Sequence, residues 1–230
     1  MIKTLPVLAV TLVALAAPQT IPAQQAKLWS DASKTVQLVD ARKANAALMR
    51  QYSWTSRTEL TEDGKVKDIR IDLLNYGPGG QLQRSLLNDQ GAPLPFGFLR
   101  RAIAEKERKK VEAYMTGLRS LLEQYTLPTP GKVLDFMTQA QMSGPDPSGA
   151  IQMTGNNVVV PGDTFTVWTD ANSRQTRRIQ VATTYQGDVV NVTATFKTLT
   201  SKLNYVAYAE ATVPAKQMNV QVSNFDYNRN

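Results

Sequence analysis

From Ala150 to its end, the chain repeats apolar and polar residues with a period of two. Such a period puts every second side chain on the same face, so each run predicts a strand with one apolar and one polar face. Gly, Pro, Asp and Asn residues separate the runs, which indicates short strands joined by tight turns in an antiparallel sheet. The residues that share a face are Phe165 and Val167; Ile179, Val181, Thr183 and Tyr185; Val190, Val192, Ala194 and Phe196; Tyr205, Ala207 and Ala209; and Met218, Val220 and Val222.

The same period occurs earlier, after a predicted helix at residues 31–49. Residues 51–60 alternate, and Asp63-Gly64 is a strong signal for a hairpin turn. Ile69, Ile71 and Leu73 then alternate with charged residues, and residues 81–88 predict a third strand. This first region therefore predicts a meander with one dry face and one wet face.

Two predicted helices separate these strand regions. Residues 98–125 carry an apolar stripe at three- and four-residue spacing, and a shorter helix is expected over residues 132–141. The order of a helix, three strands, two helices and about six strands predicts an α+β fold. We expect a single curved antiparallel sheet, an unclosed β-barrel, with helices covering its concave face. The middle helices, about residues 98–141, would form a helical lid. Residues 104–110 carry no large apolar side chain, so this section should adhere weakly to the sheet.

The first residues have the layout of a secretory signal peptide. Lys3 supplies a positive start, and an apolar run from Leu5 to Ala17 is too short to span a membrane, which takes roughly 20 apolar residues. Ala23 is a small residue at the expected cleavage point. We therefore predict a signal peptide at residues 1–23 and one half-barrel domain at residues 24–230, periplasmic or secreted after cleavage. The chain has no cysteine, so the lipid anchor of a bacterial lipoprotein is not expected either.

Composition excludes several kinds of chemistry. The chain has neither histidine nor cysteine, which excludes the common catalytic triads and the usual zinc sites. Its acidic residues occur mostly at predicted turns or on wet strand faces, where turn chemistry explains them. We therefore predict a protein that is not an enzyme and that has no metal and no cofactor. The net charge is +7, but no nucleic-acid recognition motif accompanies it, so nucleic acid is not an expected partner.

A set of apolar strand residues remains as the candidate site. Trp54 and the alternating residues of the second strand are predicted to line one end of the sheet, opposite residues of the later strands. These residues either pack under the helices as an ordinary core, or leave a cleft for an acyl chain. The candidate ligand-binding residues are Trp54, Ile69, Ile71, Leu73, Phe165, Val167, Ile179, Val181, Val192 and Phe196.

A basic stretch in the long middle helix is the second candidate surface. Its sequence at residues 105–110 is EKERKK, which is either a solvated helix turn with internal ion pairs or a docking patch for acidic lipid or a protein partner. The candidate partner or membrane residues are Arg100, Arg101, Lys106, Arg108, Lys109 and Lys110.

The layout resembles the periplasmic lipoprotein-carrier superfamily. The most similar stretch is VWTDANSRQTRRIQV at residues 167–181, where a strand ends in a turn and the next strand begins with basic residues. The superfamily includes the lipoprotein carriers and outer-membrane lipoprotein receptors of the Lol system, mycobacterial lipid-binding lipoproteins and periplasmic sigma-factor regulators. The resemblance implies an unclosed barrel with helices on its concave face, diffuse apolar ligand contacts and no catalytic residues.

These observations lead to two functional hypotheses. The first is an exported soluble envelope protein that binds a lipid, a lipidated protein or another hydrophobic ligand in a half-barrel. The alternative is a non-catalytic interaction module with a filled core that acts through its basic surface helix, with an anionic envelope surface as one candidate partner. An elongated apolar cavity under the helices would favour the first, and a filled interior the second.

Overall fold

The computed structural model describes residues 32–90, 98–126 and 129–230. The predicted signal peptide, residues 1–23, lies outside them. The helices are α2 (Ala32–Met49), α3 (Phe98–Gln124), α4 (Pro130–Gln139) and the short 3-10 helix η1 (Pro214–Lys216). The strands are β1 (Tyr52–Glu62), β2 (Lys65–Tyr76), β3 (Leu82–Asp89), β4 (Gln141–Ser143), β5 (Ala150–Asn156), β6 (Thr164–Asp170), β7 (Thr176–Tyr185), β8 (Asp188–Thr198), β9 (Asn204–Val213) and β10 (Met218–Arg229).

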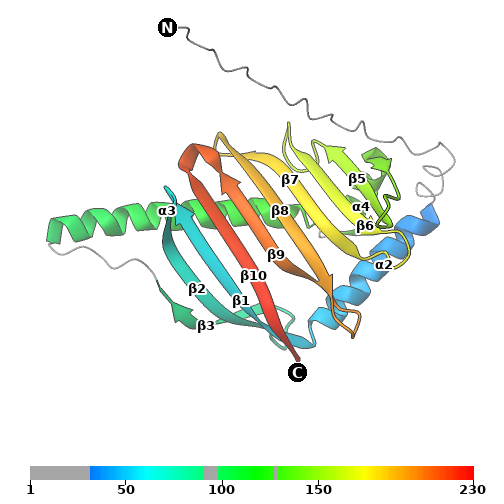
Figure 1. Cartoon of the computed structure of the whole chain (residues 1–230), viewed down its shortest axis with the longest axis horizontal. Coiled ribbons are helices and arrows are strands. Elements are labelled where there is room, and N and C mark those ends of the chain that lie inside the picture. Colours follow the sequence, from blue (N-terminus) through cyan, green and yellow to red (C-terminus); the bar gives the residue numbers. More distant parts are fainter. Residues whose placement is uncertain (1–31, 91–97, 127–128) are drawn as a thin grey trace, which may run out of the picture.

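All ten strands form one antiparallel sheet in the order β3-β2-β1-β10-β9-β8-β7-β6-β5-β4 (Figure 1). The last strand, β10, lies beside β1, so the first and last parts of the chain meet in the middle of the sheet. The two edges, β3 and β4, do not pair with each other. The predicted single, antiparallel and unclosed sheet is therefore confirmed.

Tight turns set the hairpins. Asp63 and Gly64 have φ values of 51° and 69°, and they connect Glu62 to its cross-strand partner Lys65. Both central residues of a two-residue type I′ turn need a positive φ, which Asp-Gly supplies at low steric cost. The predicted hairpin is therefore confirmed at this position.

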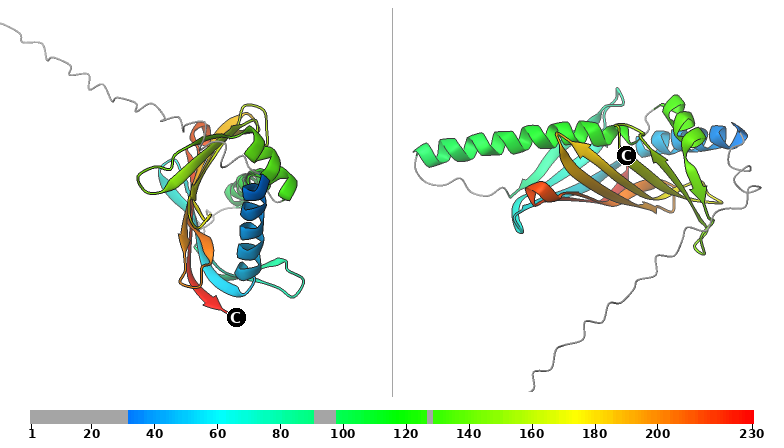
Figure 2. Two further views of the ribbon diagram at one scale, coloured as in Figure 1. Left: turned by 90° about the vertical axis from the view of Figure 1, so that its right-hand side faces the viewer. Right: turned by 90° about the horizontal axis from the view of Figure 1, so that it is seen from above.

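The α-helices that the structure describes, α2, α3 and α4, lie on the same side of a curved sheet (Figure 2). Helix α4 begins at Pro130 because Thr129 caps it: the Thr129 hydroxyl accepts a hydrogen bond of 3.3 Å from the Lys132 N–H. The predicted bounds of the helices are correct to within two residues. One residue differs in its type of structure: Gln141 was predicted as the end of the second middle helix, but it belongs to the edge strand β4, which the sequence did not predict.

Two clusters of buried apolar side chains join the helices to the sheet. The first brings α2, α4 and the end of α3 against β5, β6 and β7, with Leu121, Phe136 and Phe165 among its members. The second brings the middle of α3 against β8, β9 and β10, and includes Leu118 and Val190. We call the sheet face that contributes to these clusters the helix-facing side, and the opposite face the outer side.

Candidate ligand-binding face

Five of the predicted ligand-binding residues lie together on the helix-facing side of β6, β7 and β8. Phe165 is opposite Val181, Val167 is opposite Ile179, and Val181 is opposite Val192. All five belong to the first cluster or pack against it. The shared face is therefore confirmed, and in this half of the sheet the helices cover it.

The sixth residue of the later strands, Phe196, is only half-buried. It follows Val192 and Ala194 at two-residue spacing on β8, and its cross-strand partner on β9 is Val206. It is a member of neither cluster. Phe196 therefore lies outside the two apolar clusters, although Asn45 of α2 still hydrogen-bonds with Asn204 of β9 farther along this end of the sheet.

Trp54 faces the helices from β1. It has the same parity as Leu60, which packs against the second cluster, and β1 has no extra residue between them. The indole is 5% exposed and lies parallel to the Tyr227 ring, with ring centroids 5.7 Å apart, while Tyr76 lies 6.0 Å away. Aromatic neighbours from β2 and β10 therefore fix its position.

The predicted position of Ile69, Ile71 and Leu73 is wrong. Their cross-strand partners are Glu59, Arg57 and Thr55, so the three residues lie on the outer side, and Trp54 is opposite Leu74 instead. The cause is a bulge: the register shifts between Leu60 and Thr61, where β2 has one extra residue. Since the side-chain period of a strand is two, one extra residue moves the rest of β2 to the other face.

This shift brings a different set of residues to the helix-facing side of β2 and β3. Leu74 is 4% exposed, whereas Leu82 and Leu86 of the edge strand are 41% and 51% exposed. Tyr76 is opposite Leu82, Leu74 is opposite Arg84, and Asp72 is opposite Leu86. Neither apolar cluster includes a residue of β2 or β3. Sequence reasoning missed this set, because the apolar alternation of β2 points to Ile69, Ile71 and Leu73, and the bulge turns the opposite row towards the helices.

Asp72 is a charged residue within this set, and it is fully buried. The Arg70 Nε donates to both of its carboxylate oxygens at 2.9 Å, and a terminal nitrogen of Arg84 donates at 3.2 Å. A buried carboxylate needs such partners, because removing an unpaired charge from water is expensive. Asp72 therefore fixes the two guanidinium groups at this end of the sheet.

Another buried carboxylate, Asp163, attaches the end of α3 to the sheet. The Tyr125 hydroxyl donates to it at 2.6 Å, and the N–H groups of Val158, Val159 and Val160 donate at 2.6 to 2.8 Å. Burial by itself would raise the pKa of Asp163, but these donors together hold it below its ordinary value. Asp163 therefore organises the turn before β6, as expected for an acidic residue at a turn, and it also contacts Tyr125.

Helix α3 consists of two unlike halves. Its second half is anchored by the second cluster and by Tyr114, whose hydroxyl donates to Asp188 at 3.1 Å. Burial and this hydrogen bond raise the pKa of Tyr114 to about 12. Its first half extends beyond β2 in Figure 1. The second half of α3 is therefore packed firmly on the sheet.

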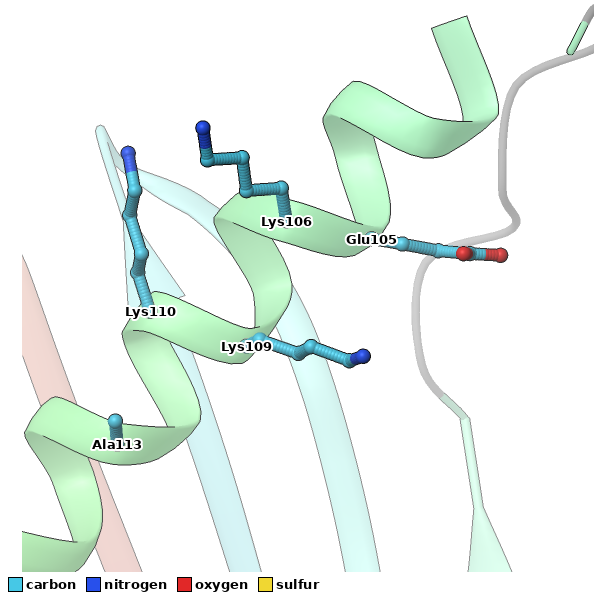
Figure 3. Close-up of a pocket in the computed structure, with 5 residues that line it drawn as sticks. All are labelled: Glu105, Lys106, Lys109, Lys110 and Ala113. Carbon is cyan, nitrogen blue, oxygen red and sulfur yellow. The ribbon is translucent and has the colours of Figure 1, made fainter. Parts of the chain in front are cut away.

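The predicted basic surface lies in the first half of α3. Lys106, Lys109 and Lys110 are exposed, and Figure 3 shows Lys106 and Lys110 on one side of the helix and Lys109 on another, beside Glu105. The side chains of Arg100, Arg101 and Arg108 lie outside the described part of the structure. The three described lysines do not form a single stripe.

Two surface hollows are lined by residues that the structure describes. One of about 490 Å³ lies along α3 and is lined by Glu105, Lys106, Lys109, Lys110 and Ala113 (Figure 3). One of about 200 Å³ lies between α4 and the end of β5, where Lys132, Asp135, Phe136 and Asn157 line it. None of the ten predicted ligand-binding residues lines either hollow.

Within residues 32–90, 98–126 and 129–230, the side chains form no group of three carboxylates, imidazoles or thiols that could hold a metal ion. None of the helices in these same ranges combines the length and the apolar character needed to cross a lipid bilayer.

Comparisons with known proteins find similarity only among solved structures: no family model and no curated protein matches the chain. A DUF1329 family protein from Desulfovibrio piger has 8% identity and a TM-score of 0.36, with 92% of this chain and 94% of that chain covered. An outer membrane lipoprotein-sorting protein domain from Vibrio parahaemolyticus has 9% identity and a TM-score of 0.38, with 86% and 93% covered. A LolA superfamily protein from Nitrosomonas europaea has 7% identity and a TM-score of 0.35, with 81% and 91% covered.

The second and third of these names belong to the carrier group that the sequence layout resembles. At TM-scores below 0.5 and identities below a tenth, these likenesses carry no conclusion about a ligand or a partner. The function therefore has to be argued from the side chains of this chain.

Proposed function

We propose that this chain is an exported envelope protein that binds a lipid, a lipidated protein or another hydrophobic molecule on the concave, helix-facing side of its sheet. The observation that carries the proposal is the apolar set at the β1–β3 end of that side. Trp54 and Leu74 are buried there, Leu82 and Leu86 are exposed, and none of them belongs to the two clusters under the helices.

The division of the helix-facing side supports this location. Under β5 to β8 the apolar side chains contact the helices, so Phe165, Val167, Ile179, Val181 and Val192 act as the supporting core rather than as a free surface. At the β1–β3 end, a ligand chain would cover Leu82 and Leu86 and gain roughly 25 cal/mol for each Å² of apolar surface removed from water. We retain Trp54 and Phe196 from the predicted residues as ligand contacts, and add Leu74, Leu82 and Leu86.

The first half of α3 is a candidate lid over this end. Glu105, Lys106, Lys109 and Lys110 are exposed, whereas Val111, Tyr114 and Leu118 pack into the second cluster. A section whose described side chains are charged and exposed costs little to move when a ligand enters. We propose that residues 104–110 move and that residues 111–124 stay fixed on the sheet.

A titration with a fluorescent fatty acid, together with native mass spectrometry of protein purified from its own envelope, tests the proposal. We expect saturable binding in the intact protein. Leu86→Asp should weaken it by about tenfold or more, since the new carboxylate would lie against the chain of the ligand. Val189→Asp is the matched control, because Val189 is 54% exposed and lies on the outer side of β8. Absence of any saturable signal and of any bound lipid would reject the proposal.

The interaction module is a second candidate, favoured by the exposure of Lys106, Lys109 and Lys110 on α3. Exposed lysines raise the local positive potential and can attract an acidic partner or an anionic lipid surface. Reversal of the three charges to Glu should abolish partner recovery in a crosslinking pull-down and leave the melting temperature unchanged. Unchanged recovery would reject this surface.

A further inference from the structure

The strand β3 presents an unusual row of side chains to the helix-facing side. Leu82, Arg84 and Leu86 follow one another at two-residue spacing, so an arginine stands between two exposed leucines at the edge of the sheet. The Arg84 side chain is 34% exposed, and the buried Leu74 lies opposite it on β2. A guanidinium group between apolar side chains is the pattern that an amphiphile with an anionic head would match.

The hydrogen bonds of Arg84 leave it free to bind a second anion. A guanidinium group has five N–H donors, and one terminal nitrogen of Arg84 contacts Asp72 at 3.2 Å. Arg70 occupies the same carboxylate more closely, with its Nε at 2.9 Å from both oxygens. Two guanidinium groups therefore share one buried carboxylate, and Arg84 is the less engaged of the two.

Arg84 has the positive charges of Arg70 and Arg119 and the carboxylate of Asp72 among its described neighbours, while the side chain of Asp89, opposite Arg70 on β3, lies outside the described part. Asp68 also faces the helices, but it lies three same-face positions from Leu74, about 20 Å along β2 at the usual rise of a strand. Arg119 of α3 pairs with Glu123 at 2.9 Å. Burial lowers the pKa of Arg84, and the positive charges of Arg119 and Arg70 lower it further, against the opposing effect of Asp72. A bound anion would offset this repulsion.

We propose that Arg84 binds the carboxylate or phosphate head of an anionic amphiphile, whose chain lies over Leu82 and Leu86 and extends toward Trp54. The inference rests on the proposed function and adds to it the class of the ligand. Another explanation of an inward-pointing charge on an edge strand is protection against strand pairing between molecules. That explanation predicts aggregation when the charge is removed and no effect on the choice of ligand.

Binding of oleate, oleyl alcohol and inorganic phosphate to the intact protein tests the inference. Oleate should bind more tightly than oleyl alcohol by about tenfold or more, as expected when a charge-assisted hydrogen bond is added. Arg84→Gln should remove this preference and leave oleyl alcohol binding unchanged, while Arg84→Lys, which keeps the charge, should retain part of it. Arg57→Gln is the matched control: its side chain is 36% exposed, pairs with Glu59 and lies on the outer side.

The outcomes separate the inference from the proposed function. Equal binding of oleate and oleyl alcohol would overturn the role of Arg84 and leave the hydrophobic site standing, as would a preference that persists in Arg84→Gln. Binding of neither probe would reject the proposed function and this inference together. If inorganic phosphate displaced oleate and the acyl chain of oleate added nothing to the affinity, the site would be one for a free anion. That result would contradict binding of an amphiphile. Melting curves of the variants establish that each is folded. If the sedimentation profile changes only in Arg84→Gln, and this variant still prefers oleate to oleyl alcohol, the arginine protects the sheet edge instead.

Discussion

The contact between Tyr125 and Asp163 holds the end of the long helix on the sheet, and Tyr125→Phe should measure its strength. Tyr125 is 3% exposed and Asp163 is 1% exposed. The tyrosine hydroxyl gives its one proton to the carboxylate at 2.6 Å, so the Thr183 hydroxyl, 2.8 Å away, acts as a donor to the tyrosine oxygen. Removal of the hydroxyl therefore breaks one hydrogen bond to a charged group and leaves a buried threonine without its partner.

A hydrogen bond to a charged group contributes about 1.5–3 kcal/mol to the free energy of unfolding. In a domain of this size, 1 kcal/mol corresponds to about 2–4 °C, so Tyr125→Phe should lower the melting temperature by roughly 3–12 °C at pH 7. Tyr185→Phe is the control, because the hydroxyl of the half-buried Tyr185 accepts one neutral hydrogen bond, from Gln186; its effect should stay within about 1 kcal/mol.

The pH dependence of this loss has a definite sign. The pKa of Asp163 is lowered in the folded protein, so its ionised form stabilises the fold above its unfolded pKa, and this contribution disappears as the pH falls through the folded pKa. The difference between the native protein and Tyr125→Phe should therefore shrink below about pH 4. Calorimetric scans between pH 7 and pH 3 measure it. An unchanged melting temperature at pH 7, or a difference that stays constant down to pH 3, would refute this account of the contact.

Three further predictions concern helix α3. Gly117→Ala should destabilise the protein although alanine favours helices, because a Cβ at this position would clash with the Tyr185 hydroxyl; a melting temperature that rises would contradict the placement of the ring. Leu118→Ala should cost about 2–5 kcal/mol in urea unfolding, since Leu118 is 1% exposed, and a loss below 1 kcal/mol would mean that α3 is loosely held. In hydrogen exchange, amides of residues 104–110 should exchange faster than those near Ile179 and slow down with ligand; equal protection in both places would indicate a static helix.

The sequence was sufficient for those parts of the fold that depend on local chemistry. The Asp63-Gly64 turn requires two positive φ values and was predicted from its two residues. The pairing of Val181 with Val192 follows from a strict period of two across the tight turn between β7 and β8. In these cases the structure depends on residues that are neighbours in the sequence, so a single sequence is enough to predict it.

The part of the site at the β1–β3 end could not be predicted in the same way. One extra residue near Lys67 reverses the faces of β2, and neither composition nor spacing marks it. After this bulge, Asp72 is buried between Arg70 and Arg84. That arrangement is a contact between strands and not a local sequence pattern. The functional roles of these residues remain predictions, because the sequence shows whether a strand face is apolar but does not show which group covers that face.

Quenching of tryptophan fluorescence by a brominated fatty acid tests the central claim most directly. The chain has only three tryptophans, and two of them, Trp54 and Trp168, lie on opposite faces of the sheet. Trp54 faces the helices at the proposed site, whereas Trp168 lies on the outer side of β6, where Arg178 covers its ring at 5.3 Å. Two variants isolate them: Trp29→Phe with Trp168→Phe, and Trp29→Phe with Trp54→Phe. A ligand bound at the β1–β3 end should quench Trp54 in a saturable manner and leave Trp168 unaffected. Equal quenching of both, or none of Trp54 at concentrations that saturate the protein, would contradict a hydrophobic site on the helix-facing side.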